Sequence, residues 1–95
     1  MSGVMLVKQK VADVAQWNTV FCDPQLDAVR RSHGLTVTGT YIDGDDSQTV
    51  IVVMDMDDIG RARAFAGSPE LASARKRAGA IGSPDGVWLG PTPVG

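Results

Sequence analysis

Gln9 and Trp17 are the side chains whose types and spacing best fit a site for a small molecule. Gln9 lies on the apolar face of Val4–Val11, a segment that alternates as a strand. Trp17 lies on the apolar stripe of the helix expected next. A buried amide and a buried indole N–H both need hydrogen-bond partners. Their meeting between sheet and helix would suit a mostly apolar pocket, and a hydrogen-bonded core pair without a ligand is the open alternative.

His33 is the only side chain whose ordinary pKa lies near neutrality, so it is a candidate proton shuttle at the edge of such a pocket. It stands directly before Gly34, a typical helix stop, and a favourable interaction with the helix C-terminus is the favoured alternative. Cys22 could act as a nucleophile with His33 as its base. In one continuous helix eleven residues separate the two by about 16 Å, so only a sharp break at Pro24 could bring them together. We therefore expect Cys22 to be a small apolar side chain in the core.

Three further residues are candidate contacts for a substrate. Asn18, beside Trp17, could orient a carbonyl group, although a solvated helix position is the simpler interpretation. Tyr41 and Trp88 could form part of a pocket wall, although Tyr41 stands near a turn and could be exposed. Gln9 and His33 are thus the catalytic candidates, and the binding candidates are Trp17, Asn18, Tyr41 and Trp88.

Alternation, caps and turns along the chain predict the order β-α-β-β-α-β. This is the ferredoxin-like α+β arrangement, a four-stranded antiparallel sheet with the helices on one face. Asp13 and then Asp57 or Asp58 begin the two helical regions, which break and restart at Asp23-Pro24 and Ser68-Pro69. The expected strands are Val4–Val11, Leu35–Ile42, Gln48–Met56 and Gly86–Leu89, with a hairpin turn over residues 43–47.

The third expected strand is apolar on both of its faces. Val50, Val52 and Met54 point one way, and Ile51 and Val53 point the other. Two helical regions can cover only one face, so the other face needs a second protein surface. The simplest supplier is a second copy of this chain, and we expect a homodimer that forms through its sheet faces.

Length and composition exclude several classes of protein. The 95 residues and 10.0 kDa predict a single domain over residues 1–95. A net charge of −2 argues against nucleic-acid binding, and the arginines at residues 61, 63, 75 and 77 are expected on a solvated helix face. Arg30 and Arg31 flank the end of the first helical region, where cations are favourable. Arg30 could reach an anionic substrate, but a surface position near the helix end is the simpler interpretation. One cysteine and one histidine leave no metal site, and the acidic groups fit turns and caps instead. Without a basic, apolar leader or a membrane-spanning run, we expect a soluble, cytoplasmic protein.

In this order of elements, several short segments resemble the dimeric α+β barrel superfamily, and within it small proteins of the cyclase-like and antibiotic-biosynthesis-monooxygenase-like types. The resemblance spans nearly the whole chain. Many of these relatives have a histidine where this chain has Gln9, so the resemblance supplies no acid or base on the first strand. The matching segments are Val11-Ala12-Asp13 with Trp17, Ala64-Phe65 with Ser68-Pro69-Glu70-Leu71, and Ala78-Gly79 with Gly82 and Pro84.

The resemblance implies an enzyme of the cofactor-independent monooxygenase or cyclase type, acting on an apolar aromatic or polyketide-like molecule. Such chemistry depends on positioning and on hydrogen bonds to a developing enolate or phenolate. No cofactor, metal, nucleic acid or membrane is implied. The alternative is a non-catalytic homodimeric module that binds a small molecule or a protein, because the sequence offers no convincing acid, base or nucleophile.

Overall fold

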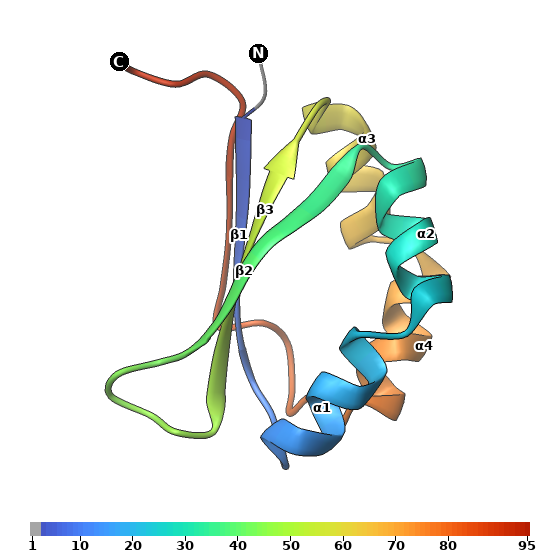
Figure 1. The fold of residues 1–95 in the computed structure, drawn as a ribbon, viewed down its shortest axis with the longest axis vertical. Helices are drawn as coiled ribbons and strands as arrows, with labels where there is room; N and C mark the ends of the chain where they lie inside the picture. Colours follow the sequence, from blue (N-terminus) through green and yellow to red (C-terminus); the bar gives the residue numbers. More distant parts are fainter. Residues whose placement is uncertain (1–2) are drawn as a thin grey trace.

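The computed structural model describes residues 3–95 and has the predicted order of elements, with each helical region divided into two helices (Figure 1). Among these residues, no helix combines the length and apolar character needed to cross a membrane. The strands are β1 (Gly3–Lys10), β2 (Leu35–Ile42), β3 (Thr49–Met56) and β4 (Gly86–Gly90). The helices are α1 (Val14–Phe21), α2 (Pro24–Ser32), α3 (Ile59–Ala66) and α4 (Pro69–Arg77).

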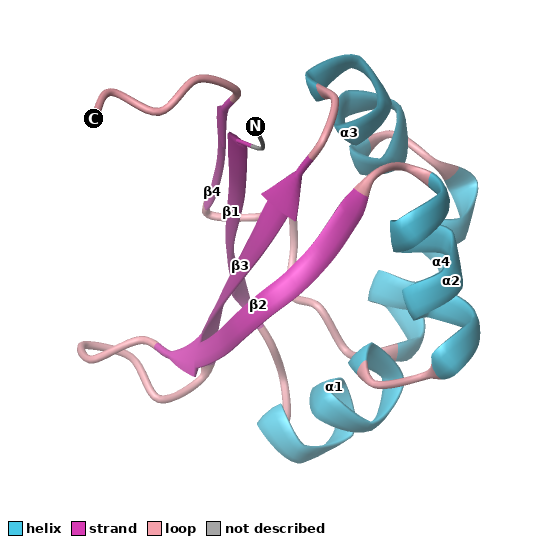
Figure 2. Cartoon of the chain, turned by 45° about the horizontal axis from the view of Figure 1, so that its top comes forward, coloured by secondary structure: helices cyan, strands magenta, loops and turns pink. Residues whose placement is uncertain are grey.

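The four strands form one antiparallel sheet in the order β2-β3-β1-β4, which confirms the ferredoxin-like prediction. All four helices lie on the same side of this sheet, and its other face is left open (Figures 1 and 2). Gly34 ends the first helical region with a φ of 74°, a left-handed conformation that glycine adopts without strain. The site must therefore be sought between the sheet and the helices or on the open face.

The breaks inside both helical regions arise from caps followed by proline. Asp13 begins α1 by accepting a hydrogen bond from a first-turn backbone N–H. Asp23 begins α2 and Ser68 begins α4 in the same way, with Pro24 and Pro69 at the start of each new helix. Proline fits there because the first helical N–H has no intrahelical acceptor. Each break lets the chain bend, so four short helices follow the twist of the sheet.

The two faces of β3 are buried to different extents, as the sequence predicts. Val50, Val52 and Met54 are buried beneath the helices, whereas Ile51 and Val53 are only half-buried on the open face. The register places Leu6 of β1 opposite both Val53 and Trp88. The open face therefore carries an apolar surface that this chain alone leaves uncovered. We call it the open-face patch, and its members are Val4, Leu6, Tyr41, Ile51, Val53 and Trp88.

Two glycines let the aromatic rings of the open-face patch lie flat along their strands. A Cβ at Gly39 would lie 2.6 Å from the Tyr41 hydroxyl oxygen, and one at Gly86 would collide with the Trp88 ring. Both rings thus cover a glycine two residues earlier, which is the closest neighbour on the same face of a strand. The two rings therefore cover the strand backbone at these glycines, on the face where another sheet could pack.

Candidate functional site

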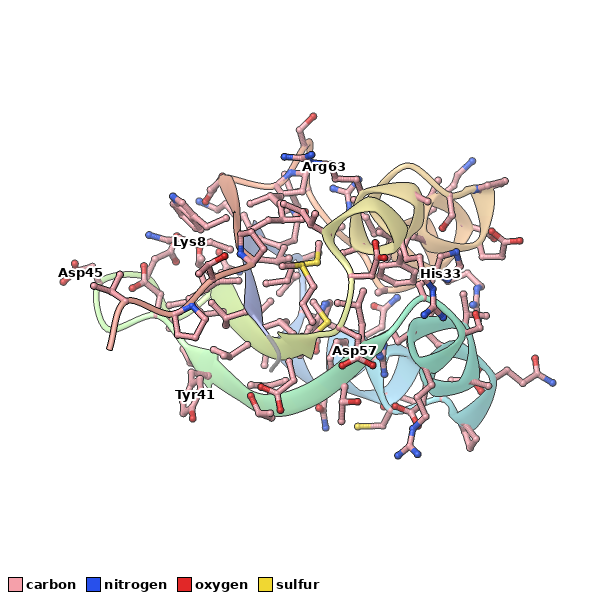
Figure 3. All side chains as sticks on the ribbon, turned by 90° about the horizontal axis from the view of Figure 1, so that it is seen from above. Lys8, His33, Tyr41, Asp45, Asp57 and Arg63 are labelled. Atoms are coloured by element: carbon pink, nitrogen blue, oxygen red, sulfur yellow. The ribbon has the colours of Figure 1, made fainter. Side chains whose placement is uncertain are left out.

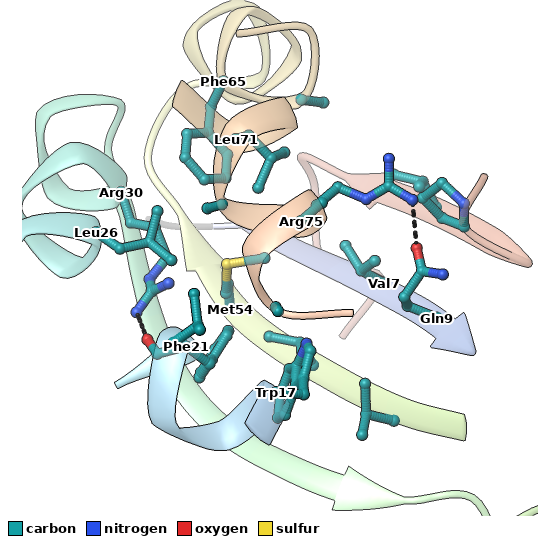
Figure 4. A pocket seen from close by; sticks show the side chains of 18 of the residues that line it. Val7, Gln9, Trp17, Phe21, Leu26, Arg30, Met54, Phe65, Leu71 and Arg75 are labelled. Carbon is teal, nitrogen blue, oxygen red and sulfur yellow. Dashed lines mark hydrogen bonds between the residues drawn. The ribbon is translucent and has the colours of Figure 1, made fainter. Parts of the chain in front are cut away.

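A cavity of about 160 Å³ lies between the sheet and the helices (Figure 4). Its volume is close to the roughly 150 Å³ of a protein cavity that holds one benzene ring. Most of its wall is aliphatic or aromatic, so it favours an apolar ring over water. Side chains from β1, β3 and all four helices line it, among them Val7, Phe21, Leu26, Met54, Phe65 and Leu71.

Gln9 and Arg75 form the polar end of this cavity. The Gln9 side chain is 5% exposed, and its Nε2 donates to the backbone oxygens of Lys10 at 2.7 Å and Ile81 at 3.1 Å. Its Oε1 accepts a hydrogen bond of 2.7 Å from Arg75 Nη2, which also donates to the Gly82 backbone oxygen at 2.6 Å (Figure 4). The amide orientation is therefore fixed by three partners, and one lone pair of Oε1 is left for a ligand.

Arg75 is not the solvated surface residue that the sequence predicts. It is half-buried and lines the cavity, where its Nη2 reaches both Gln9 on β1 and the Gly82 backbone oxygen. The signal was present in the sequence: an amide at Gln9 in an apolar layer requires a donor from an element packed against it.

Arg30 lines the cavity from α2, and its predicted position on a solvated surface is also wrong. The residue is 4% exposed, and its Nη2 donates to the Phe21 backbone oxygen at 2.8 Å. Its guanidinium carbon lies 4.3 Å from the centre of the Phe21 ring, a cation–π contact. Burial lowers the pKa of Arg30, and the Asp27 carboxylate acts in the opposite direction. Leu26 and Arg30 are both buried because they share one face of α2, four residues apart.

Trp17 forms a wall of the cavity, as the sequence suggests. The indole is 8% exposed and stacks on Phe21, with ring centres 4.6 Å apart and planes 19° apart. Offset or parallel stacking of this kind fixes both rings. Gln9 and Trp17, which the sequence pairs as a pocket, both line the cavity.

The other candidate residues lie elsewhere. His33 is half-buried at the end of α2, where Nδ1 lies 2.8 Å from the Val29 backbone oxygen and the ring tilts against Phe65. Figure 3 shows it among the helices, whereas Tyr41 projects from the sheet. Asn18 and Tyr41 border a shallow groove between α1 and β2, with Trp17 shared between groove and cavity. Trp88, 54% exposed, belongs to the open-face patch.

Cys22 is exposed at the end of α1, so its predicted position in the core is wrong. Asp23 caps α2 immediately afterwards, and the chain turns outward between the two helices. The Cys22 thiol lies 3.6 Å from the Asn18 side-chain oxygen and does not line the cavity.

The cavity can bind an apolar ring and stabilise negative charge on it. Among the described residues that line it, none is a histidine, a carboxylic acid, a cysteine, a lysine or a tyrosine. Its polar side chains are one amide, one indole and two guanidinium groups, and guanidinium groups do not deprotonate at physiological pH. A proton lost by a ligand would therefore pass to water, while the charge left behind would be held by hydrogen-bond donors.

The fold is that of solved antibiotic biosynthesis monooxygenases. No protein-family model matches the chain, and no curated protein sequence matches it. A Streptomyces coelicolor monooxygenase bound to nanaomycin D is similar with a TM-score of 0.66 at 16% identity, over 99% of this chain and 89% of that one. An antibiotic biosynthesis monooxygenase has a TM-score of 0.61 at 12% identity, over 97% and 98% of the chains, respectively. A Nitrosomonas europaea protein assigned to the same group has a TM-score of 0.62 at 10% identity, over 96% and 89%. These similarities confirm the resemblance to the dimeric α+β barrel superfamily as a likeness of fold.

Proposed function

We propose that this protein is a monooxygenase-type enzyme that acts on a small aromatic molecule carrying an acidic hydroxyl group. The observation that carries the proposal is the cavity of about 160 Å³, which is apolar over most of its wall and ends at the Gln9–Arg75 pair. The similarity to monooxygenase structures supports the reaction class.

The proposed reaction needs an electron-rich ring, because molecular oxygen reacts readily with carbanions and phenolates. Gln9 Oε1 would accept a hydrogen bond from the hydroxyl group of a bound phenol. Once water has taken the hydroxyl proton, the guanidinium groups that line the cavity would stabilise the oxyanion. For a single-ring phenol the overall step is phenol plus O₂ giving 1,4-benzoquinone plus water, in which one oxygen atom enters the ring. The protein would contribute positioning and charge stabilisation.

Binding and turnover test the proposal separately. Titration with 4-nitrophenol, a single-ring phenol, should quench Trp17 fluorescence in a Trp88→Phe background, because Trp17 lines the cavity and Trp88 does not. An oxygen electrode should then record uptake with phenol above the rate in buffer, with benzoquinone formed in equal amount. Quenching without oxygen uptake would indicate a binding protein that is not an enzyme. The absence of both signals would contradict the whole proposal.

A non-catalytic binding module is the second candidate function. The observation in its favour is that the described lining residues offer no general base. The two functions differ in one measurement, since a binding module would hold aromatic ligands in the cavity and return them unchanged after prolonged incubation with oxygen.

We also propose that the protein forms a homodimer through the open-face patch. Tyr41 is 59% exposed and Trp88 is 54% exposed, an unusual position for large rings on a small chain. Leu6 and Val53 lie between them in the sheet register and are only half-buried. A second copy would cover all of these side chains with an equivalent surface.

Val53→Lys should weaken this dimer roughly tenfold, because the substitution places an unpaired charge at the centre of the interface. Val53 is half-buried within the chain, so the fold should survive. Sedimentation analysis over a range of concentrations measures the dissociation constant. Ala72→Lys, at an exposed position of α4, is the matched control and should leave the dimer unchanged. A monomeric wild-type protein would contradict the proposal.

A further inference from the structure

Arg30 is a buried cation whose counter-charge is incomplete. Among the described residues, the carboxylate paired with its guanidinium is that of Asp27, with Oδ1 4.0 Å from Arg30 Nη2. The other oxygen of Asp27 is bonded to Arg31 Nε at 2.9 Å, so one partly exposed carboxylate serves two arginines. The Cys22 thiol is the remaining ionisable group close to Arg30, and Arg75 at the other end of the cavity adds a second positive charge.

The hydrogen bonding of Arg30 is also incomplete. Its Nε is buried and has no hydrogen-bond partner among the described residues, although Nη2 is bonded to the Phe21 backbone oxygen. A guanidinium cannot shed its proton at physiological pH, so this N–H is a permanent donor inside an apolar site. A buried donor without a partner destabilises the protein, and does so more when the group is charged.

A structural role explains only part of this arrangement. Phe21 is the last residue of α1, and a cation is favourable near the carbonyl groups of a helix C-terminus. The contact with the Phe21 oxygen and the stacking on its ring account for Nη2 and for one face of the guanidinium (Figure 4). Among the described residues, the Nε–H is left without a hydrogen-bond partner, and the shared Asp27 carboxylate supplies only part of the counter-charge. An anionic group on a ligand in the cavity would supply both.

We propose that the cavity takes its aromatic ligand as an anion, a single-ring phenolate, with Arg30 as the counter-charge. This inference rests on the proposed function because it uses the same cavity, and it names the ionisation state of the ligand. The volume limits the ligand to one ring, since about 160 Å³ is close to the volume of a protein cavity that binds one benzene molecule. Arg30 and Arg75 then place a positive charge at each end of the cavity, and none of the described lining residues is an Asp or Glu that would repel the anion.

The test uses 4-nitrophenol, whose anion has its own absorption band, and 4-nitroanisole, which has the same ring and cannot ionise. The wild-type protein should lower the pKa of bound 4-nitrophenol by about one unit or more, so that the anion binds roughly tenfold tighter than the neutral phenol. Arg30→Met should abolish most of that shift and weaken anion binding roughly tenfold. Its affinity for 4-nitroanisole should change by less than about threefold, because methionine keeps the apolar contacts of the side chain.

Three further variants keep the result interpretable. Arg30→Lys retains the charge and should preserve a large part of the shift. Asp27→Asn removes the partial counter-charge and should strengthen anion binding. Arg63→Met removes one positive charge from an exposed position of α3 and should change nothing. If Arg30→Met does not fold, the wild-type shift together with the lysine and asparagine variants still decides the matter.

Two outcomes overturn the inference in different ways. If the wild-type protein binds 4-nitroanisole but leaves the pKa of bound 4-nitrophenol unchanged, the anion subsite is wrong and the aromatic pocket stands. If neither compound binds, the proposed function and the inference fail together. A shift that persists undiminished in Arg30→Met would assign the anion to Arg75 and contradict the role of Arg30.

Discussion

Replacing Ala74 by leucine is expected to lower the affinity for 4-nitroanisole by about 10- to 100-fold while the protein remains folded. Ala74 is 2% exposed on α4 and lines the cavity, so the added carbons would occupy the space of the ligand ring. Filling a void is an ordinary route to higher stability, whereas overfilling costs about 1–3 kcal/mol. Ligand titration and thermal unfolding of the same sample measure both effects.

Ala72→Leu is the matched control, because the substitution is the same and position 72 is exposed on α4. It should leave the affinity unchanged. Should Ala74→Leu also bind normally, the ligand occupies another place, and the groove bordered by Asn18 and Tyr41 becomes the candidate. A stable Ala74→Leu protein that has lost binding would mean that the cavity is kept open at a cost in packing, as expected for a site under functional selection.

The sequence predicts the fold because its signals are local and agree with one another. Caps and prolines at Asp23-Pro24 and Ser68-Pro69 mark where the helices break, and the structure begins α2 and α4 there. The two apolar faces of β3 give the layer arrangement, since one face packs under helices and the other is left half-buried. Each of these conclusions needs only residue spacing within one element.

The candidate site is predicted only in part, because it depends on which side chains different elements bring together. Gln9 and Trp17 are found because a polar or amphipathic group in an apolar stripe requires a partner. Arg30 and Arg75 resemble any arginine near the end of a helix, and only the tertiary packing buries them. His33 is the opposite case: its side chain is the one best suited to proton transfer, but it bonds to the Val29 backbone oxygen and does not line the cavity.

The positions of the two arginines change what the cavity can do. With Gln9 and Trp17 alone, the cavity would be a neutral pocket for any apolar ring of the right size. With a guanidinium at each end, the cavity favours a ring that carries negative charge, the form of a phenol that reacts with oxygen. Binding and the proposed chemistry would then depend on the same electrostatic feature.

A double-mutant cycle on Gln9 and Arg75 should reveal strong coupling in the free energy of unfolding. Gln9→Leu removes an acceptor from Arg75 and two hydrogen bonds to the Lys10 and Ile81 oxygens, so we expect a loss of about 1–3 kcal/mol. Arg75→Met leaves Gln9 Oε1 and the Gly82 oxygen without their donor, with a loss of similar size, about 1–3 kcal/mol. Urea denaturation of the four proteins measures these values.

The double variant should lose less free energy of unfolding than the sum of the two single losses, by about 0.5–3 kcal/mol. The reason is that the first substitution has already broken the Gln9–Arg75 hydrogen bond, so the second cannot break it again. Additive losses would mean that the Gln9–Arg75 bond contributes nothing beyond its separate contacts. The same cycle on nitrophenol affinity should also show coupling. Arg75 adds positive charge at the end of the cavity opposite Arg30, and Gln9 holds Arg75 in place, so Gln9→Leu should weaken anion binding in the wild type and have little further effect in Arg75→Met. If Gln9 and Arg75 are coupled in both measurements, their hydrogen bond both stabilises the fold and positions the positive charge of the site.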